Sequence, residues 1–418
     1  MSTLRQLLFS NQGNRQIFLK NSFWRFAGVL PSKLLRFFII LLAAKQLGPE
    51  SFGVYNYAVA LVSMAFIVSD WGINILLIRD YQHFEDKNKI VTTSFVAKIS
   101  ILFISTIVAL GILFVSGSSL SLFGIGAIIA LTFFVGHVKE LFSAIFLAMQ
   151  KAEFEARVYF IETILSIPFF YFLFFKSPSA FNLAFFYLLV STATMVASWY
   201  FASKWIKFSF KSFDKTLLIE LLKNGFVLSL FGILGYIFFS TDQLFLKYFH
   251  GYEEVGYYAL ATKIVLTLQI FPSLINSVVL PMLSQRINDK PRLKFLVARG
   301  LVAYAIAGAL ISLAIIILIK YFIFFFGAQY APSASIIKLL SPILIFMFMV
   351  SLLDHVLISF NRQKQDFYLT LLAAIANLIL CILLIPSFGM YGAVGASLIS
   401  QAFNFVLTGG YVFKLLRQ

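Results

Sequence analysis

Long apolar segments recur along the whole chain, and each is long enough to cross a membrane as an α-helix. About 20 mostly apolar residues span the bilayer core. Twelve segments meet this condition, at about residues 22–44, 54–78, 92–116, 120–148, 157–175, 181–203, 223–247, 257–283, 295–319, 335–360, 367–386 and 391–413. They are too continuous for the alternating strands of a membrane barrel. The sequence therefore predicts an all-α polytopic membrane protein of about twelve transmembrane helices.

Composition excludes most classes of soluble protein. Of the 418 residues, 61% are hydrophobic and 12% are charged, whereas about a quarter of the residues of a soluble domain are charged. A soluble enzyme, a nucleic-acid-binding module and a disordered chain are therefore excluded. The single cysteine, Cys381, allows no disulfide within the chain, and the four scattered histidines form no metal-binding pattern. We expect neither a metal nor a cofactor.

Basic residues are divided unevenly between the predicted loops. The chain has 33 Lys and Arg against 17 Asp and Glu, which gives a net charge of +16. One alternating set of loops, together with both termini, holds 22 cations, and the other set holds 4. Because basic loops stay in the cytoplasm, this bias predicts that both termini are cytoplasmic and that the number of spans is even. Residues 1–20 are expected to form either an amphipathic segment on the cytoplasmic leaflet or a frayed tail.

Two short patterns recur at equivalent places in the predicted topology. The pattern Gly-x-Glu-x-(Phe/Val)-Gly-x-Tyr-x-x-Ala begins at Gly48 and again at Gly251, 203 residues later. The pattern Gln-Lys-x-(Glu/Asp)-Phe begins at Gln150 and again at Gln363, 213 residues later. Two six-helix halves in parallel orientation around a central cavity explain both intervals, and this is the architecture of an alternating-access transporter. The predicted parts are residues 1–20, a first bundle at 21–203, a basic linker at 204–222 and a second bundle at 223–418.

The first of these patterns also carries a resemblance to a known family. The run Leu-Gly-Pro-Glu-Ser-Phe-Gly-Val-Tyr from Leu47, followed by Asp70-Trp71-Gly72-Ile73, resembles the start of O-antigen and related lipid-linked oligosaccharide flippases. Asp242-Gln243-Leu244, Val255-Gly256-Tyr257-Tyr258 and the glycine-rich stretch after Pro386 look like the same family. These flippases form the polysaccharide-transporter branch of the superfamily that also contains multidrug and toxin extruders.

The resemblance covers nearly the whole chain and implies more than the residues do. It implies a bundle of six plus six helices around a central cavity. It also implies that an undecaprenyl-diphosphate-linked oligosaccharide is moved from the cytoplasmic to the periplasmic leaflet of the bacterial inner membrane. The expected partners are that substrate, membrane lipids, and the polymerase and chain-length regulator of the same pathway. The protein is expected to be a monomer that binds no nucleic acid and catalyses no reaction.

Three cations, Arg25, Lys33 and Arg36, lie within the first predicted span. At 100° per residue, Arg25 and Arg36 differ by about 20° and Lys33 lies about 60° from Arg36, so all three share one helix face. Each would cost roughly 2.5–3.5 kcal/mol at the bilayer centre. We therefore predict that this face binds the diphosphate headgroup, because Arg suits a diphosphate; ion pairing within the bundle is the alternative. Pro31 predicts a kink beside the cations.

Other charged residues within spans extend the prediction. Lys139 and Lys263 are added to the headgroup site, whereas Lys98 and Lys338 lie near span ends and are expected to reach toward the interface. The candidates for coupling to H⁺ or Na⁺ are Asp70, Glu140, Asp242, Asp354 and His355. An alternative role for the acids near span ends, including Glu162, is to neutralise neighbouring cations. Histidine is included because it titrates near neutral pH.

The nearest alternative function is a multidrug or cation extruder on the same fold. Such a pump should line its cavity with acids, whereas seven cations and five acids lie within the predicted spans. An anionic substrate is therefore favoured. A glycosyltransferase, ligase or polymerase would need a large catalytic loop, and the predicted connections are short.

Overall fold

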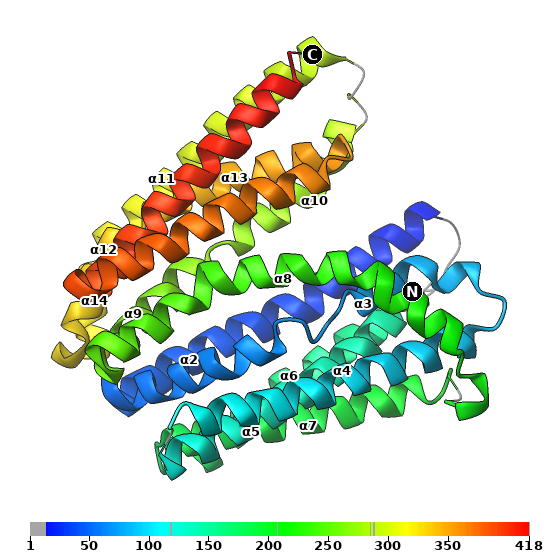
Figure 1. The fold of residues 1–418 in the computed structure, drawn as a ribbon, viewed down its shortest axis with the longest axis horizontal. Coiled ribbons are helices and arrows are strands. Elements are labelled where there is room, and N and C mark those ends of the chain that lie inside the picture. Colours follow the sequence, from blue (N-terminus) through cyan, green and yellow to red (C-terminus); the bar gives the residue numbers. More distant parts are fainter. Residues whose placement is uncertain (1–13, 118, 207, 285, 287–288, 418) are drawn as a thin grey trace, which may run out of the picture. The chain divides into compact units, whose positions relative to one another are not determined.

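The computed structural model describes residues 14–117, 119–206, 208–284, 286 and 289–417. In this part of the chain every regular element is a helix (Figure 1). The first group of helices comprises α2 (Asn14–Phe66), α3 (Ile73–Asp80), α4 (Lys87–Val115), α5 (Leu120–Ala148), α6 (Ala152–Phe169) and α7 (Ala180–Ala202). The second group comprises α8 (Lys215–His250), α9 (Tyr252–Thr267), α10 (Ile270–Ser284), α11 (Lys290–Phe326), α12 (Ala331–Leu340), α13 (Ile343–Ser359) and α14 (Gln363–Leu415).

These helices accommodate the twelve predicted crossings. Eight helices of the described residues are long and apolar enough to span a membrane, or up to nine if the bent pair α12 and α13 forms one span. Two of the eight, α2 and α14, have 53 residues each and contain a non-helical glycine, Gly48 and Gly389. At 1.5 Å per residue each is far longer than one crossing, so each is two helices joined at its glycine. Dividing α2 and α14 raises the nine spans to eleven. Counting α8, a helix of 36 residues, as one more gives twelve crossings among the described residues.

Several crossings are broken, and the sequence marked only some of the breaks. The second crossing is interrupted between α2 and α3, where Trp71 and Gly72 have φ of 46° and 66°. The eighth is interrupted between α9 and α10, and the tenth bends by 46° just before Pro342, the N-cap of α13. Pro31, where the sequence predicts a kink, does not break α2 into two helices. Within the described part of α2 the one non-helical residue is Gly48, so Pro31 lies inside continuous helix.

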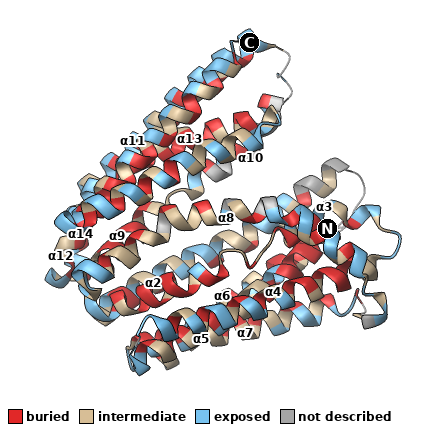
Figure 2. Cartoon of the chain, viewed as in Figure 1, coloured by how far each residue is buried: buried red, intermediate tan, exposed pale blue. Residues whose placement is uncertain are grey.

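The exposed surface of these helices is strongly apolar. Figure 2 shows exposed residues running along helices whose other faces are buried. The exposed side chains include Phe324 at 91%, Leu120 at 89% and Val115 at 84% exposure. Apolar surface on this scale needs an apolar surrounding. A multi-pass membrane protein is therefore the only consistent interpretation of the fold.

The chain divides into two compact units. One contains Met1–Leu47 and Ala58–Ile233, and the other contains Gly48–Tyr57 and Leu234–Gln418. The start of the second crossing thus belongs with the C-terminal unit. Its partners there are the residues that begin α9, the second copy of the glycine pattern.

The two copies of the glycine pattern cross each other in the C-terminal unit. A Cβ added to Gly53 would lie 1.8 Å from the carbonyl oxygen of Tyr252, and one added to Gly256 would lie 1.9 Å from that of Pro49. Pro49 and Tyr252 each precede the glycine of their own copy by four residues, so the contact is reciprocal. Gly48 and Gly251 also share one backbone conformation, with φ of 73° and 94°. The repeat seen in the sequence is therefore a pair of equivalent helix starts in close backbone contact.

Candidate headgroup site and cation site

The N-terminal unit places the three cations of α2 on an exposed face. The Arg25 and Arg36 side chains are 56% and 45% exposed, and Lys33 is exposed as well. The predicted common face is therefore accessible. Lys33 forms no ion pair and no side-chain hydrogen bond with the described residues, so its ammonium group is free to meet a ligand.

Buried acids on α6 hold the other α2 cations. Glu162, whose side chain is 1% exposed, pairs with Arg36 and accepts a hydrogen bond from Ser32 Oγ at 3.1 Å. Lys139 Nζ from α5 lies 2.9 Å from the other oxygen of Glu162. A carboxylate with three donors fixes the cations that surround it, since a buried charge is tolerated only with partners. Arg36 and Lys139 are thus brought together around Glu162, an acid for which the sequence offered only a neutralising role.

Two further ion pairs join α2 to α6. Arg25 Nε lies 3.4 Å from Glu155, and Lys20 Nζ lies 3.2 Å from Glu153. The sequence interpretation missed Glu155 because it began the fifth crossing at residue 157, whereas α6 begins at Ala152. A signal was present: Glu155 and Glu162 are seven residues apart and therefore lie on one helix face. Ion pairing within the bundle, the alternative role for these cations, thus explains the position of Arg25 and partly that of Arg36. It does not explain Lys33, which has no ion-pair partner among the described residues.

The remaining charged candidates of this unit form separate pairs. Lys98 Nζ lies 2.5 Å from Asp70 Oδ1, in the break between α2 and α3. The Lys98 side chain is 0% exposed, so the expectation that it reaches toward the interface is wrong. His137 Nδ1 lies 2.9 Å from Glu140, and its Nε2 lies 3.0 Å from Ser69 Oγ. Asp70 and Glu140 are therefore both engaged, and neither contacts the α2 cations in the described structure.

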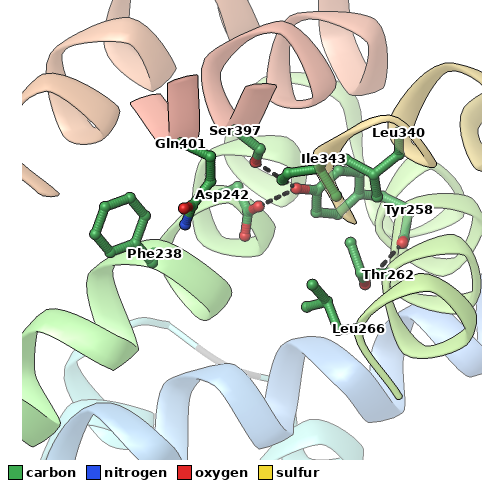
Figure 3. Close-up of a pocket in the computed structure, with 9 residues that line it drawn as sticks. All are labelled: Phe238, Asp242, Tyr258, Thr262, Leu266, Leu340, Ile343, Ser397 and Gln401. Carbon is green, nitrogen blue, oxygen red and sulfur yellow. Dashed lines mark hydrogen bonds between the residues drawn. The ribbon is translucent and has the colours of Figure 1, made fainter. Parts of the chain in front are cut away.

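The C-terminal unit contains a second polar site, around Asp242 of α8 (Figure 3). Asp242 is 3% exposed. Tyr258 Oη donates to its Oδ2 and lies 3.2 Å from Ser397 Oγ of α14, and the Gln243 backbone N–H donates to Oδ1 at 3.0 Å. The side chains of Asp242, Tyr258 and Ser397, drawn in Figure 3, line one small cavity. Its volume is about 10 Å³. The residues lining it are Phe238, Asp242, Tyr258, Thr262, Leu266, Leu340, Ile343, Ser397 and Gln401.

This cavity has room for one small ion or one water molecule. About 10 Å³ is roughly the space of one water-sized sphere. The oxygens around it come from one carboxylate and several hydroxyl and amide groups, which are hard ligands. The described residues contain no group of three or more His, Cys, Asp or Glu that could hold a metal ion. The sequence had selected Asp242 but not Tyr258 or Ser397, although Tyr258 belongs to the repeated glycine pattern.

The other C-terminal candidates lie away from Asp242. Asp354 is eleven residues along α13 from Ile343, which is about 16 Å at 1.5 Å per residue. Its carboxyl group instead faces Asp366, and His355 Nδ1 lies 2.7 Å from the Ser351 carbonyl oxygen. Lys263 of α9 is half-buried and adjacent in sequence to Thr262, which lines the cavity. It belongs to the C-terminal unit, not to the unit that contains the α2 cations.

Comparison with known proteins gives the family. A family model described as "Polysaccharide biosynthesis protein" matches residues 18–286, and the MatE model matches residues 228–383. The chain belongs to the polysaccharide biosynthesis protein family. It is also 23% identical over 414 residues to the capsular polysaccharide biosynthesis protein CapF of Staphylococcus aureus, which covers 95% of this chain and 99% of that one.

The chain shares its fold with solved transporters. An inward closed structure of the lipid II flippase MurJ has a TM-score of 0.74 at 15% identity, covering 94% of this chain and 87% of that one. An inward-facing multidrug transporter of the MATE family has a TM-score of 0.70 at 12% identity, covering 99% and 98%. These likenesses show that the chain has the same fold as these two transporters, and they confirm the polytopic all-α class predicted from the sequence.

Proposed function

We propose that the chain flips an undecaprenyl-diphosphate-linked oligosaccharide from the cytoplasmic to the periplasmic leaflet of the bacterial inner membrane by alternating access. One observation carries this proposal: an exposed cationic face on α2, in which Lys33 has no partner among the described residues and Arg36 is held by buried Glu162. Arg36 and Lys33 would bind the diphosphate, because a half-exposed guanidinium can exchange contacts without being left uncompensated. Glu162 and Lys139 act as positioning residues.

The α2 cations provide the direct test of substrate class. We expect Lys33→Ala/Arg36→Ala to abolish export of the lipid-linked glycan while the protein still inserts into the membrane. The measurement is the flipping of a fluorescent undecaprenyl-diphosphate sugar in proteoliposomes. Lys320→Ala, at the opposite set of loops, is the matched control and should transport normally. Normal flipping by the double variant would show that Lys33 and Arg36 do not bind the headgroup.

A multidrug extruder is the second candidate, and the MatE match over residues 228–383 favours it. The two functions predict opposite results in one assay. A flippase should be inhibited by undecaprenyl diphosphate and should leave cationic dyes where they are. An extruder should move such dyes and should retain that activity in Lys33→Ala/Arg36→Ala, because removing cations does not weaken cation binding.

Transport is proposed to be coupled to H⁺ or Na⁺ at Asp242. We expect Asp242→Asn to fold, because the amide can still accept from Tyr258, but to lose the acceleration that an imposed ion gradient gives to flipping. Asp354→Asn is the comparison variant, because its carboxyl group lies in a different contact. Gradient-driven flipping that survives in Asp242→Asn and fails in Asp354→Asn would move the coupling site to Asp354, with His355 beside it.

The proposed function also implies partners for the chain and an orientation in the membrane. Its partners would be the lipid-linked substrate, membrane lipids, and the polymerase and chain-length regulator that act after flipping. Both termini would be cytoplasmic, where the basic loops are expected.

A further inference from the structure

An aromatic cavity lies in the N-terminal unit, away from the α2 cations. It occurs near the ends of α4 and α7 that carry the basic loops, and the segment after α7 contributes to its wall. Its volume is about 220 Å³. The lining residues are Thr92, Phe95, Val96, Phe142, Trp199, Phe208 and Ser209. The Phe208 ring contacts those of Phe95 and Phe142 at centroid distances of 5.0 and 6.2 Å.

One polar group in this wall has no partner. Thr92 is 3% exposed, and its Oγ1 forms no hydrogen bond with any described residue. Threonines within helices commonly bond a carbonyl oxygen one turn earlier, and Thr106 of the same helix does so at 2.8 Å. A buried hydroxyl without a partner costs free energy, so a bound molecule with an acceptor oxygen would be stabilised here.

The surroundings of the cavity match a membrane interface on its cytoplasmic side. Trp199, Tyr200 and Trp205 are 56%, 58% and 48% exposed, and exposed Trp and Tyr mark the headgroup level of a bilayer. The segment that covers the cavity carries Lys204, Lys211 and Lys215, which are all exposed. Its one acid, Asp214, is used internally, because Lys89 Nζ lies 2.6 Å from it and holds the pKa of that carboxyl below its usual value.

We propose that this cavity binds one anionic phospholipid from the leaflet that faces the basic loops. An acyl chain fills the aromatic cavity, its ester carbonyl accepts a hydrogen bond from Thr92, and the phosphate lies among Lys204, Lys211 and Lys215. The lipid would fasten this segment, which the sequence identifies as the connection between the two six-helix halves, onto α4 and α5. A cavity of about 220 Å³ is too small for a peptide helix, which is 10–12 Å across.

Native mass spectrometry of the purified full chain tests the proposal with phosphatidylglycerol and phosphatidylcholine as probes. Wild type should retain one phosphatidylglycerol and release phosphatidylcholine. Val96→Phe, which fills the cavity, should retain none. Val108→Phe, an exposed position on the same helix, should behave as wild type. Thr92→Val preserves the shape and removes the hydroxyl, so it should bind about two- to tenfold more weakly, the value of one hydrogen bond.

Four outcomes would overturn the inference. Wild type could retain neither lipid, it could retain both equally, or Val96→Phe could retain as much phosphatidylglycerol as Val108→Phe. Displacement of bound phosphatidylglycerol by undecaprenyl phosphate at equal concentration would also overturn it, since the cavity would then belong to the transported lipid. None of these measurements depends on flipping, so they are separable from the test of the proposed function.

Discussion

Replacement of Glu162 by alanine is expected to lower the free energy of unfolding by about 3–5 kcal/mol, the cost of removing one partner from a buried ion pair. Glu162 is 1% exposed and Lys139 is 8% exposed, and their atoms are 2.9 Å apart. Without the carboxylate, the Lys139 ammonium would remain in the bundle with no counterion. Arg36 would suffer less, because it is 45% exposed and can turn toward water. Equilibrium unfolding in mixed micelles measures the difference.

A double-mutant cycle separates the ion pair from the packing around it. Lys139→Met should destabilise less than Glu162→Ala, because Glu162 keeps Arg36 and Ser32 as partners. Glu162→Gln/Lys139→Met removes both charges and should recover most of the stability lost in Glu162→Gln alone. If the losses from the two single variants simply add, Glu162 and Lys139 are not coupled, and the site is not held in the way the contacts imply.

This cluster shows how far the sequence could go toward the site. Helical periodicity placed Arg25, Lys33 and Arg36 on one face, and the structure exposes all three. Periodicity could not reveal which acids face them, because that depends on how α6 packs against α2. Because α6 begins at Ala152, Glu153 and Glu155 lie in its first turn. A span assigned from average hydropathy omits such charged first turns, so these two acids lie outside the predicted span.

The positions of the crossings could be predicted from the sequence more fully than the ion pairs could. A bilayer demands continuous apolar length, so span positions are encoded locally, and α5 begins and ends at the residues predicted, 120 and 148. Breaks within spans are encoded less clearly. Pro342 follows the break between α12 and α13, whereas Pro31 lies within a helix that continues with helical φ and ψ on both sides. Tertiary contacts decide between these outcomes.

Substitutions in the repeated glycine pattern are expected to have a large effect on both flipping and stability. We expect Gly53→Ala and Gly256→Ala each to reduce flipping at least tenfold and to destabilise the protein by about 1–3 kcal/mol through overpacking. In each case the new methyl group would meet a backbone carbonyl oxygen at under 2 Å, and a backbone cannot turn aside as a side chain can. The control is Gly111→Ala on α4, where an added Cβ meets nothing within 4 Å. That variant should be neutral or slightly stabilised, because alanine favours helix.

The reciprocity of the contact makes the prediction sharper. One separation of the two helix starts relieves both clashes, so Gly53→Ala/Gly256→Ala should cost clearly less than the sum of the two single variants. The separation should also be visible chemically. A cysteine at Tyr55, which is 7% exposed, in a Cys381→Ser background should react faster with an impermeant maleimide when Gly256→Ala is present than when Gly111→Ala is. Equal labelling rates would mean that the helix starts stay together and that the loss of flipping has another origin. Faster labelling would show that the added methyl group separates the two helix starts, as the close backbone contact requires.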